Sequence, residues 1–151
     1  MTTSDKKRMQ WHEPPQRHLD TVVFVHGILG DHRKTWGKFP ELLTADDDLP
    51  VLDILMWGYR TGWFRRHHKL HLEGGHLLSA LEGYVRQDND IVLVGHSMGG
   101  LVILKGLIDR MRVLKAAQKP PCHAVHWIIL IACPLSGVWF AGIVTSPRVA
   151  P

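Results

Sequence analysis

The amino-acid sequence predicts an α/β protein with a doubly wound parallel sheet, and three observations support this fold class. Segments with the composition of strands alternate with segments of helical periodicity along most of the chain. Three of the strand-like segments are continuously apolar, which is typical of strands covered on both faces. Acidic turns stand just before two of the strand-like segments. This order needs right-handed crossovers and therefore predicts helices on both faces of one sheet.

About four segments are expected to form strands, because each is short and rich in β-branched or aromatic residues. They are residues 21–26, 51–57, 91–94 and 126–132. The first, third and fourth contain the continuous apolar runs, Val22-Val23-Phe24-Val25, Ile91-Val92-Leu93-Val94 and Trp127-Ile128-Ile129-Leu130-Ile131.

Three segments are expected to form the crossover helices. Residues 71–86 place leucines on one face at helical spacing, and residues 98–115 carry a broad apolar stripe. Residues 35–44 are a shorter candidate, because Pro40 interrupts the pattern. Each helix falls between two strands, as a crossover requires.

Length and composition indicate one globular domain. The chain has 151 residues, of which 45% are hydrophobic and 21% charged. Residues 1–19 are polar and contain Pro14-Pro15, so we expect a flexible N-terminal arm ahead of a domain over residues 20–151. A signal peptide and a membrane-spanning segment are both missing from the pattern, and we therefore expect a cytoplasmic protein.

The pattern of charged residues indicates which classes of partner to expect. The formal net charge is +4, without a basic stripe or a nucleic-acid-binding motif, so no nucleic-acid partner is expected. Residues 60–71 are basic with Trp63 and Phe64 between them. This segment is compatible with peripheral membrane contact, although a solvated loop leading into a helix is the better explanation. The histidines form no H-E-x-x-H pair, and we expect neither a metal nor a cofactor.

The clearest chemical motif is Gly95-His96-Ser97-Met98-Gly99, between a predicted strand and a predicted helix. A turn of this spelling is sharp and lifts the serine hydroxyl above the sheet edge, which predicts Ser97 as a catalytic nucleophile. Gly95 and Gly99 lack the Cβ atoms that would clash with the neighbouring strand and helix. We expect His96 to pack beside the serine. Without this context, the pattern could be a glycine-bounded strand end alone.

A second motif follows the first strand, in His26-Gly27-Ile28-Leu29-Gly30. Acyl transfer needs two N–H donors on the oxygen of its tetrahedral intermediate. One donor would be the backbone N–H of Met98, and the other would be that of Ile28 or Leu29. His26 and Gly27 would support this oxyanion loop, although a His-Gly pair can also be a simple strand-ending turn.

Together the motifs resemble the α/β-hydrolase superfamily, and within it the serine esterases and lipases related to GPI inositol-deacylases. The resemblance covers roughly residues 20 to 140 and rests on residues 24–31, 34–36 and 95–102, with a strand ending in Gly58-Tyr59. The loop Pro134-Leu135-Ser136-Gly137 is also similar, with Cys133 where threonine is usual.

The resemblance implies ester hydrolysis through an acyl-serine without a cofactor, on an ester or lipid-like small molecule. It also implies that the strand over residues 21–26 lies beside the nucleophile strand.

The acid and base that should accompany the serine have no evident position. In this fold they follow the serine along the chain, on loops after later strands. The last carboxylate is Asp109, inside a predicted helix, and the last histidine is His126. His126 opens a strand at the end opposite the active edge, about 20 Å away. We therefore expect an incomplete, C-terminally truncated hydrolase domain.

Two functions remain open at this point. One is a serine hydrolase of carboxylic esters whose acid and base are missing from the chain or supplied from elsewhere. The other is a non-catalytic hydrolase remnant that binds a lipid or a protein partner. An incomplete sheet exposes an edge strand, which favours self-association.

Overall fold

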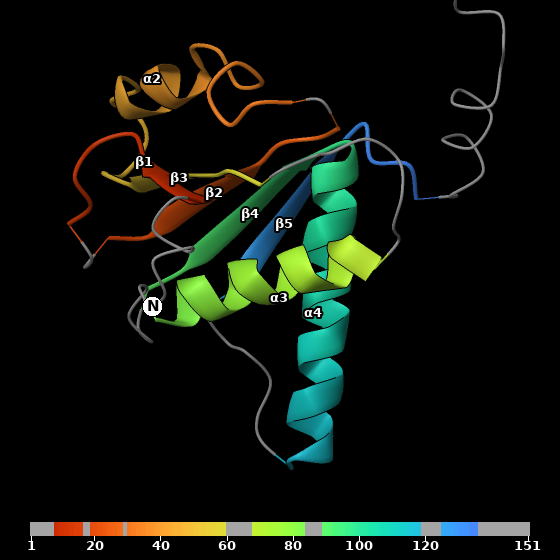
Figure 1. Ribbon diagram of the computed structural model, residues 1–151. Coiled ribbons are helices and arrows are strands. Elements are labelled where there is room, and N and C mark those ends of the chain that lie inside the picture. Colours follow the sequence, from red (N-terminus) through yellow and green to blue (C-terminus); the bar gives the residue numbers. More distant parts are fainter. Residues whose placement is uncertain are drawn as a thin grey trace, which may run out of the picture.

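The computed structural model describes residues 8–16, 19–28, 30–59, 68–83, 89–118 and 125–135. Within these ranges, five strands form one sheet in the order β1-β3-β2-β4-β5 (Figure 1). Most of the basic segment 60–71, Leu29 and residues 136–151 lie outside the described residues.

Four of the five strands run parallel, as the alternation of patterns predicts. They are β2 (Thr21–Val25), β3 (Asp53–Trp57), β4 (Ile91–His96) and β5 (Val125–Ile131). β2 lies between β3 and β4, which confirms its predicted place beside the strand that leads to Ser97. Because Val25 is in register with both Trp57 and Gly95, the three carboxyl ends meet at one edge.

A fifth strand lies in the range for which the polar composition predicts an arm. β1 (Met9–Trp11) pairs antiparallel with β3, and the Arg8 carbonyl accepts a hydrogen bond from the Gly58 N–H at 2.7 Å. The Met9 side chain is buried in the core. Three residues are too few to show a strand pattern in the sequence. The division of the chain into an arm and a hydrolase domain stays a prediction.

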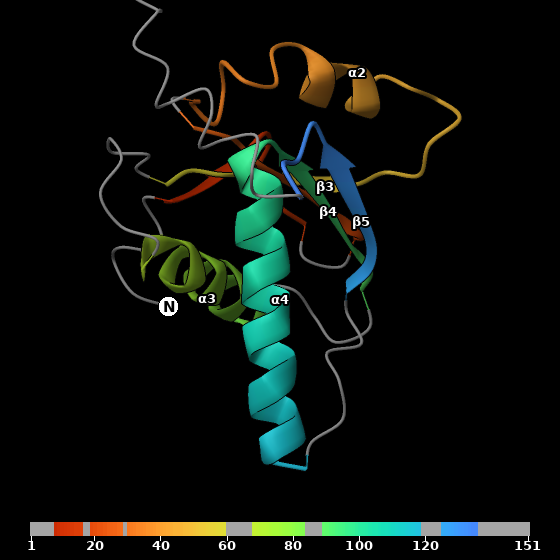
Figure 2. The same ribbon diagram turned by 90° about the vertical axis from the view of Figure 1, so that its right-hand side faces the viewer.

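Helices cover both faces of the sheet. α2 (Phe39–Thr44) lies on one face, and α3 (His68–Glu82) and α4 (Met98–Ala116) lie on the other (Figures 1 and 2). The start of α2 at Phe39 places Pro40 in the first turn, where the ring needs no hydrogen-bonded N–H. Proline therefore begins this helix instead of interrupting it.

The two faces of the central strands fill two separate apolar clusters. Val23, Leu55 and Leu93 belong to the cluster that includes residues of α3 and α4. Phe24 and Val94 point the other way and pack in a cluster with Trp36 and Met56. Every residue of β2 is buried, as its continuous apolar run predicts.

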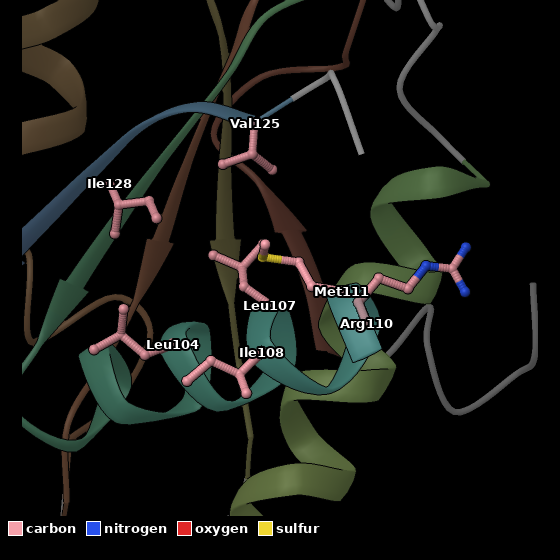
Figure 3. Close-up of a pocket in the computed structure, with 7 residues that line it drawn as sticks. All are labelled: Leu104, Leu107, Ile108, Arg110, Met111, Val125 and Ile128. Atoms are coloured by element: carbon pink, nitrogen blue, oxygen red, sulfur yellow. The ribbon is translucent and has the colours of Figure 1, made fainter. Parts of the chain in front are cut away.

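β5 departs from the predicted burial on both faces. Trp127 is 70% exposed and Ile129 48% exposed, although their run is as apolar as that of β2. Within the described residues, β4 alone pairs with β5, and α4 packs on it. An apolar groove of about 310 Å³ lies between α4 and β5 (Figure 3). Its lining residues are Leu104, Leu107, Ile108, Arg110, Met111, Val125 and Ile128.

None of the helices in the described ranges combines the length and the apolar character needed to cross a lipid bilayer.

Candidate active site

The turn between β4 and α4 holds Ser97 in a conformation that L-residues rarely adopt. Its φ is 53° and its ψ is −122°, at the junction between the last residue of β4 and the first of α4. A non-glycine residue in such a region costs about 1 to 3 kcal/mol and needs support from its surroundings. Part of that support comes from β5, because the Ile131 carbonyl accepts a hydrogen bond from the Ser97 N–H at 2.8 Å.

Gly95 and Gly99 allow this turn to pack against the strand and helix beside it. A Cβ atom on Gly99 would lie 2.1 Å from the Val25 carbonyl oxygen of β2. A Cβ atom on Gly95 would lie 2.6 Å from the Gly100 Cα of α4. Both distances are shorter than real Cβ contacts, so larger residues would displace the backbone around Ser97.

The Ser97 side chain has no hydrogen bond to a histidine or a carboxylate within the described residues, and it does not cap α4. The Gly100 N–H bonds to the Ser97 carbonyl at 3.1 Å. The N–H groups of Met98 and Gly99 belong to the first turn of α4, where no intrahelical acceptor exists. Ser97 therefore stands at a helix end that carries partial positive charge and free donors.

The loop after β2 lies directly against Ser97. A Cβ atom on Gly27 would be 2.8 Å from the Ser97 Cβ and 3.0 Å from the His96 carbonyl oxygen. The Gly27 carbonyl accepts a hydrogen bond from the Gly30 N–H at 3.2 Å, which closes the loop. Ile28 is partly exposed next to this contact, whereas Leu29 lies outside the described residues. The structure thus brings the two predicted motifs together at one edge of the sheet.

His26 lies beneath the loop and is 1% exposed. Its Nδ1 is 2.9 Å from the Gly27 carbonyl oxygen, and its Nε2 accepts a hydrogen bond from the Tyr59 N–H at 3.3 Å. Burial lowers the pKa of His26, because a charged imidazolium would lose its hydration there. The neutral ring is therefore a structural part of the loop.

His96 packs beside the turn, on the side of Trp36. The two rings meet edge to face, with centroids 6.3 Å apart and an interplanar angle of 82°. The buried His96 Nδ1 has no hydrogen-bond partner among the described residues.

Asp109 and His126 both lie away from Ser97. The Asp109 carboxylate pairs with Lys105 one turn earlier in α4, and this hydrogen bond lowers the pKa of Asp109. His126 Nδ1 lies 2.8 Å from the Asp90 carboxylate, where β5 begins. Since Ile131 at the other end of β5 contacts Ser97, His126 is at the opposite edge of the sheet.

Tyr59 lies at the carboxyl edge of the sheet with Ser97, although the sequence patterns assign it no role. It follows β3 after Gly58, and its side chain is buried against His26. Its position in the sequence could have indicated this edge, because a polar aromatic residue just after a parallel strand lies where ligands bind. Burial, and then the nearby Glu73 carboxylate, raise the pKa of Tyr59, so its hydroxyl is a proton donor.

The described part of the chain contains no candidate metal centre. Within those ranges no three side chains of His, Cys, Asp or Glu gather closely enough to hold an ion.

The parallel sheet, its helices on both faces and the serine turn at its carboxyl edge define an α/β-hydrolase fold. Comparison with known families agrees over most of the chain. The chain belongs to the alpha/beta hydrolase family, whose family model matches residues 22–151.

Individual relatives are distant. Protein SERAC1 of Mus musculus is 27% identical to this chain over 131 residues, which cover 69% of this chain and 19% of that protein. The type II thioesterase BorB from the borrelidin biosynthetic cluster superposes with a TM-score of 0.56 at 16% identity, over 84% of this chain and 49% of that chain. MenH from S. aureus has a TM-score of 0.56 at 21% identity, with coverages of 83% and 42%.

The esterase RhEst1 from Rhodococcus sp. ECU1013 has a TM-score of 0.55 at 18% identity, over 83% of this chain and 42% of that chain. At these identities the likeness to solved structures establishes the fold. The chain spans less than half the length of these structures and about one fifth of SERAC1.

Proposed function

We propose that this chain carries the nucleophile and oxyanion loop of a serine hydrolase that acts on carboxylic esters. The observation that carries the proposal is the strained Ser97, held at the start of α4 with Gly27 against it. Such strain persists at functional sites because it presents a group to a substrate. Neighbours with esterase and thioesterase in their names share the fold and are compatible with this chemistry.

In the proposed reaction, the Ser97 Oγ attacks the ester carbonyl carbon and gives its proton to a general base. The carbonyl oxygen becomes an oxyanion that accepts hydrogen bonds from the Met98 N–H and from the N–H of Ile28 or Leu29. The alcohol then leaves with a proton, and water releases the acid from the acyl-serine. The proposal assigns no residue to the base, since no histidine among the described residues hydrogen-bonds the Ser97 side chain.

A fluorophosphonate probe tests the proposal without knowledge of the ester. The Ser97 oxygen would form a bond to phosphorus, fluoride would leave, and the protein would gain the mass of the phosphonyl group. We expect labelling of the wild-type chain and no labelling of Ser97→Ala. The matched control is Ser79→Ala, which removes an exposed serine of α3 and should leave labelling unchanged.

Labelling that survives in Ser97→Ala, or a folded wild-type chain that takes no label, would contradict the hydrolase proposal. The second of these results would favour the other candidate.

We propose as the second candidate a non-catalytic role in which two copies associate through β5. Among the described residues, β5 lies at the edge of the sheet, and its side chains from His126 to Ile129 are exposed. An edge strand presents unpaired backbone donors and acceptors, which a second strand satisfies and a lipid chain does not. A protein partner, and a second copy in particular, therefore fits this edge better than a lipid.

A further inference from the structure

Tyr59 contacts His26 in three ways. Its ring stacks on the His26 ring, with centroids 4.5 Å apart and an interplanar angle of 16°. Its hydroxyl donates a hydrogen bond to the His26 carbonyl oxygen at 2.7 Å. Its backbone N–H donates to His26 Nε2 at 3.3 Å. One residue just after β3 thus holds both the main chain and the side chain of the residue that follows β2.

These contacts select one form of the His26 ring. The Tyr59 N–H is a donor, so Nε2 must be an acceptor, and the Gly27 carbonyl is an acceptor, so Nδ1 must carry the proton. Protonation of the ring would remove the lone pair that Tyr59 uses. His32 and Asp31 also face the ring, and their charges act in opposite directions on its pKa.

The His26 ring in turn orients the peptide between Gly27 and Ile28. The Gly27 carbonyl accepts hydrogen bonds from His26 Nδ1 and from the Gly30 N–H, which fix its direction. The Ile28 N–H belongs to the same planar, trans peptide and must point the opposite way. Any rotation of the Gly27 carbonyl therefore turns the Ile28 N–H by the same angle, directly beside Ser97.

Tyr59 is itself anchored from outside the site. The preceding residue, Gly58, donates its N–H to the Arg8 carbonyl of the β1 segment. The Arg8 guanidinium pairs with the Glu73 carboxylate of α3 at 3.1 Å. The end of β3 is thereby tied to the edge strand and to a helix, which gives Tyr59 a rigid base.

We infer that Tyr59 is a positioning residue for the oxyanion loop: through His26 it sets the direction of the Gly27–Ile28 peptide beside Ser97. The catalytic consequence rests on the proposed serine hydrolase function. The orientation of the peptide does not, and it can be measured on its own.

The test compares Tyr59→Phe with the wild-type chain by nuclear magnetic resonance of 15N-labelled protein. Phenylalanine keeps the stacked ring and the backbone N–H but loses the hydroxyl bond to His26. We expect the His26 ring nitrogens and the Ile28 amide to shift. Thr44→Val is the matched control, because it removes a hydroxyl that bonds to backbone carbonyls in α2.

A second arm measures the rate at which a fluorophosphonate labels Ser97. A misplaced oxyanion donor should slow this rate roughly 10- to 100-fold in Tyr59→Phe and leave it unchanged in Thr44→Val. If the wild-type chain takes no label, the hydrolase proposal fails, and the resonance arm still decides the role of Tyr59. Unchanged His26 and Ile28 signals in Tyr59→Phe, or an unchanged labelling rate in a chain that labels, would overturn the inference.

Discussion

The backbone at Ser97 combines a strained conformation with several independent restraints. Its φ of 53° places the Cβ atom where an L-residue meets its own backbone, and the Ile131 carbonyl and the N-terminus of α4 keep it there. Gly27 and Gly99 remove the side chains that would push the turn away from β2. The contacts around Ser97 thus offset the free-energy cost of its strained backbone. Without them, the serine would adopt an ordinary conformation.

The strain predicts that Ser97→Gly stabilises the fold. Glycine adopts a positive φ without a Cβ clash, which relieves about 1 to 3 kcal/mol, and it loses about 0.5 to 1 kcal/mol through greater freedom in the unfolded chain. We expect the free energy of unfolding in urea to rise by about 1 kcal/mol. Ser97→Ala keeps the Cβ atom and should stay close to wild type. Equal stabilities of the glycine and alanine variants would show that the turn is not strained.

At the scale of elements, α3 and α4 cross at a pair of glycines. A Cβ atom on Gly74 would lie 2.6 Å from the Val102 carbonyl oxygen and 2.7 Å from the Gly106 Cα. The two helix backbones therefore touch at this crossing, with no side chain between them. Because α4 begins at the serine turn, the crossing helps to set the direction in which its N-terminus points.

The neighbouring glycines of α3 provide a matched pair for a stability test. Gly74→Ala should lower the free energy of unfolding by about 2 to 3 kcal/mol, because the methyl group forces the helices apart. Gly75 has open space around its Cβ position, and Gly75→Ala should raise the free energy of unfolding by about 0.5 to 1 kcal/mol. Urea titrations of both variants measure the difference. A Gly74→Ala variant as stable as Gly75→Ala would rule out the close crossing.

At the scale of the whole molecule, most of the large apolar side chains that are exposed among the described residues lie on α4, on β5 and in the loop after it. On the α4 side of β5, Ile128, Ile108 and Met111 are exposed around the groove between the two elements (Figure 3), whereas Trp127 and Ile129 are exposed on the other face of the strand. Apolar side chains exposed on both faces of an edge strand favour its pairing with a second chain. The opposite edge of the sheet is the short strand β1, and three residues offer few donors and acceptors to a second chain.

This asymmetry predicts association through β5. Sedimentation velocity at micromolar concentration should show a dimer or larger species for the wild-type chain. A charge on an edge strand opposes pairing with a second copy, so Trp127→Lys should shift the population to the monomer. Val51→Lys is the control, because Val51 is also 70% exposed but lies in the loop before β3. A monomeric wild-type chain, or equal effects of the two lysines, would contradict the prediction.

Patterns within a few residues of one another predicted much of the fold. The apolar runs indicated four strands and the helical stripes indicated α3 and α4, because strand and helix periodicities are properties of neighbouring side chains. The turn around Ser97 was predictable for the same reason, since its glycines stand two residues to either side. β1 was missed because its three residues show no periodicity and owe their strand to pairing with β3.

Sequence by itself determined the fold class, the place of Ser97 between a strand and a helix, and the presence of a His-Gly loop. Only the tertiary structure decided that Tyr59 holds His26, because the order of the strands brings together residues that stand 33 positions apart. It also decided that the apolar run of β5 is exposed while that of β2 is buried. Burial depends on which elements pack against a strand, and that information lies outside the strand itself.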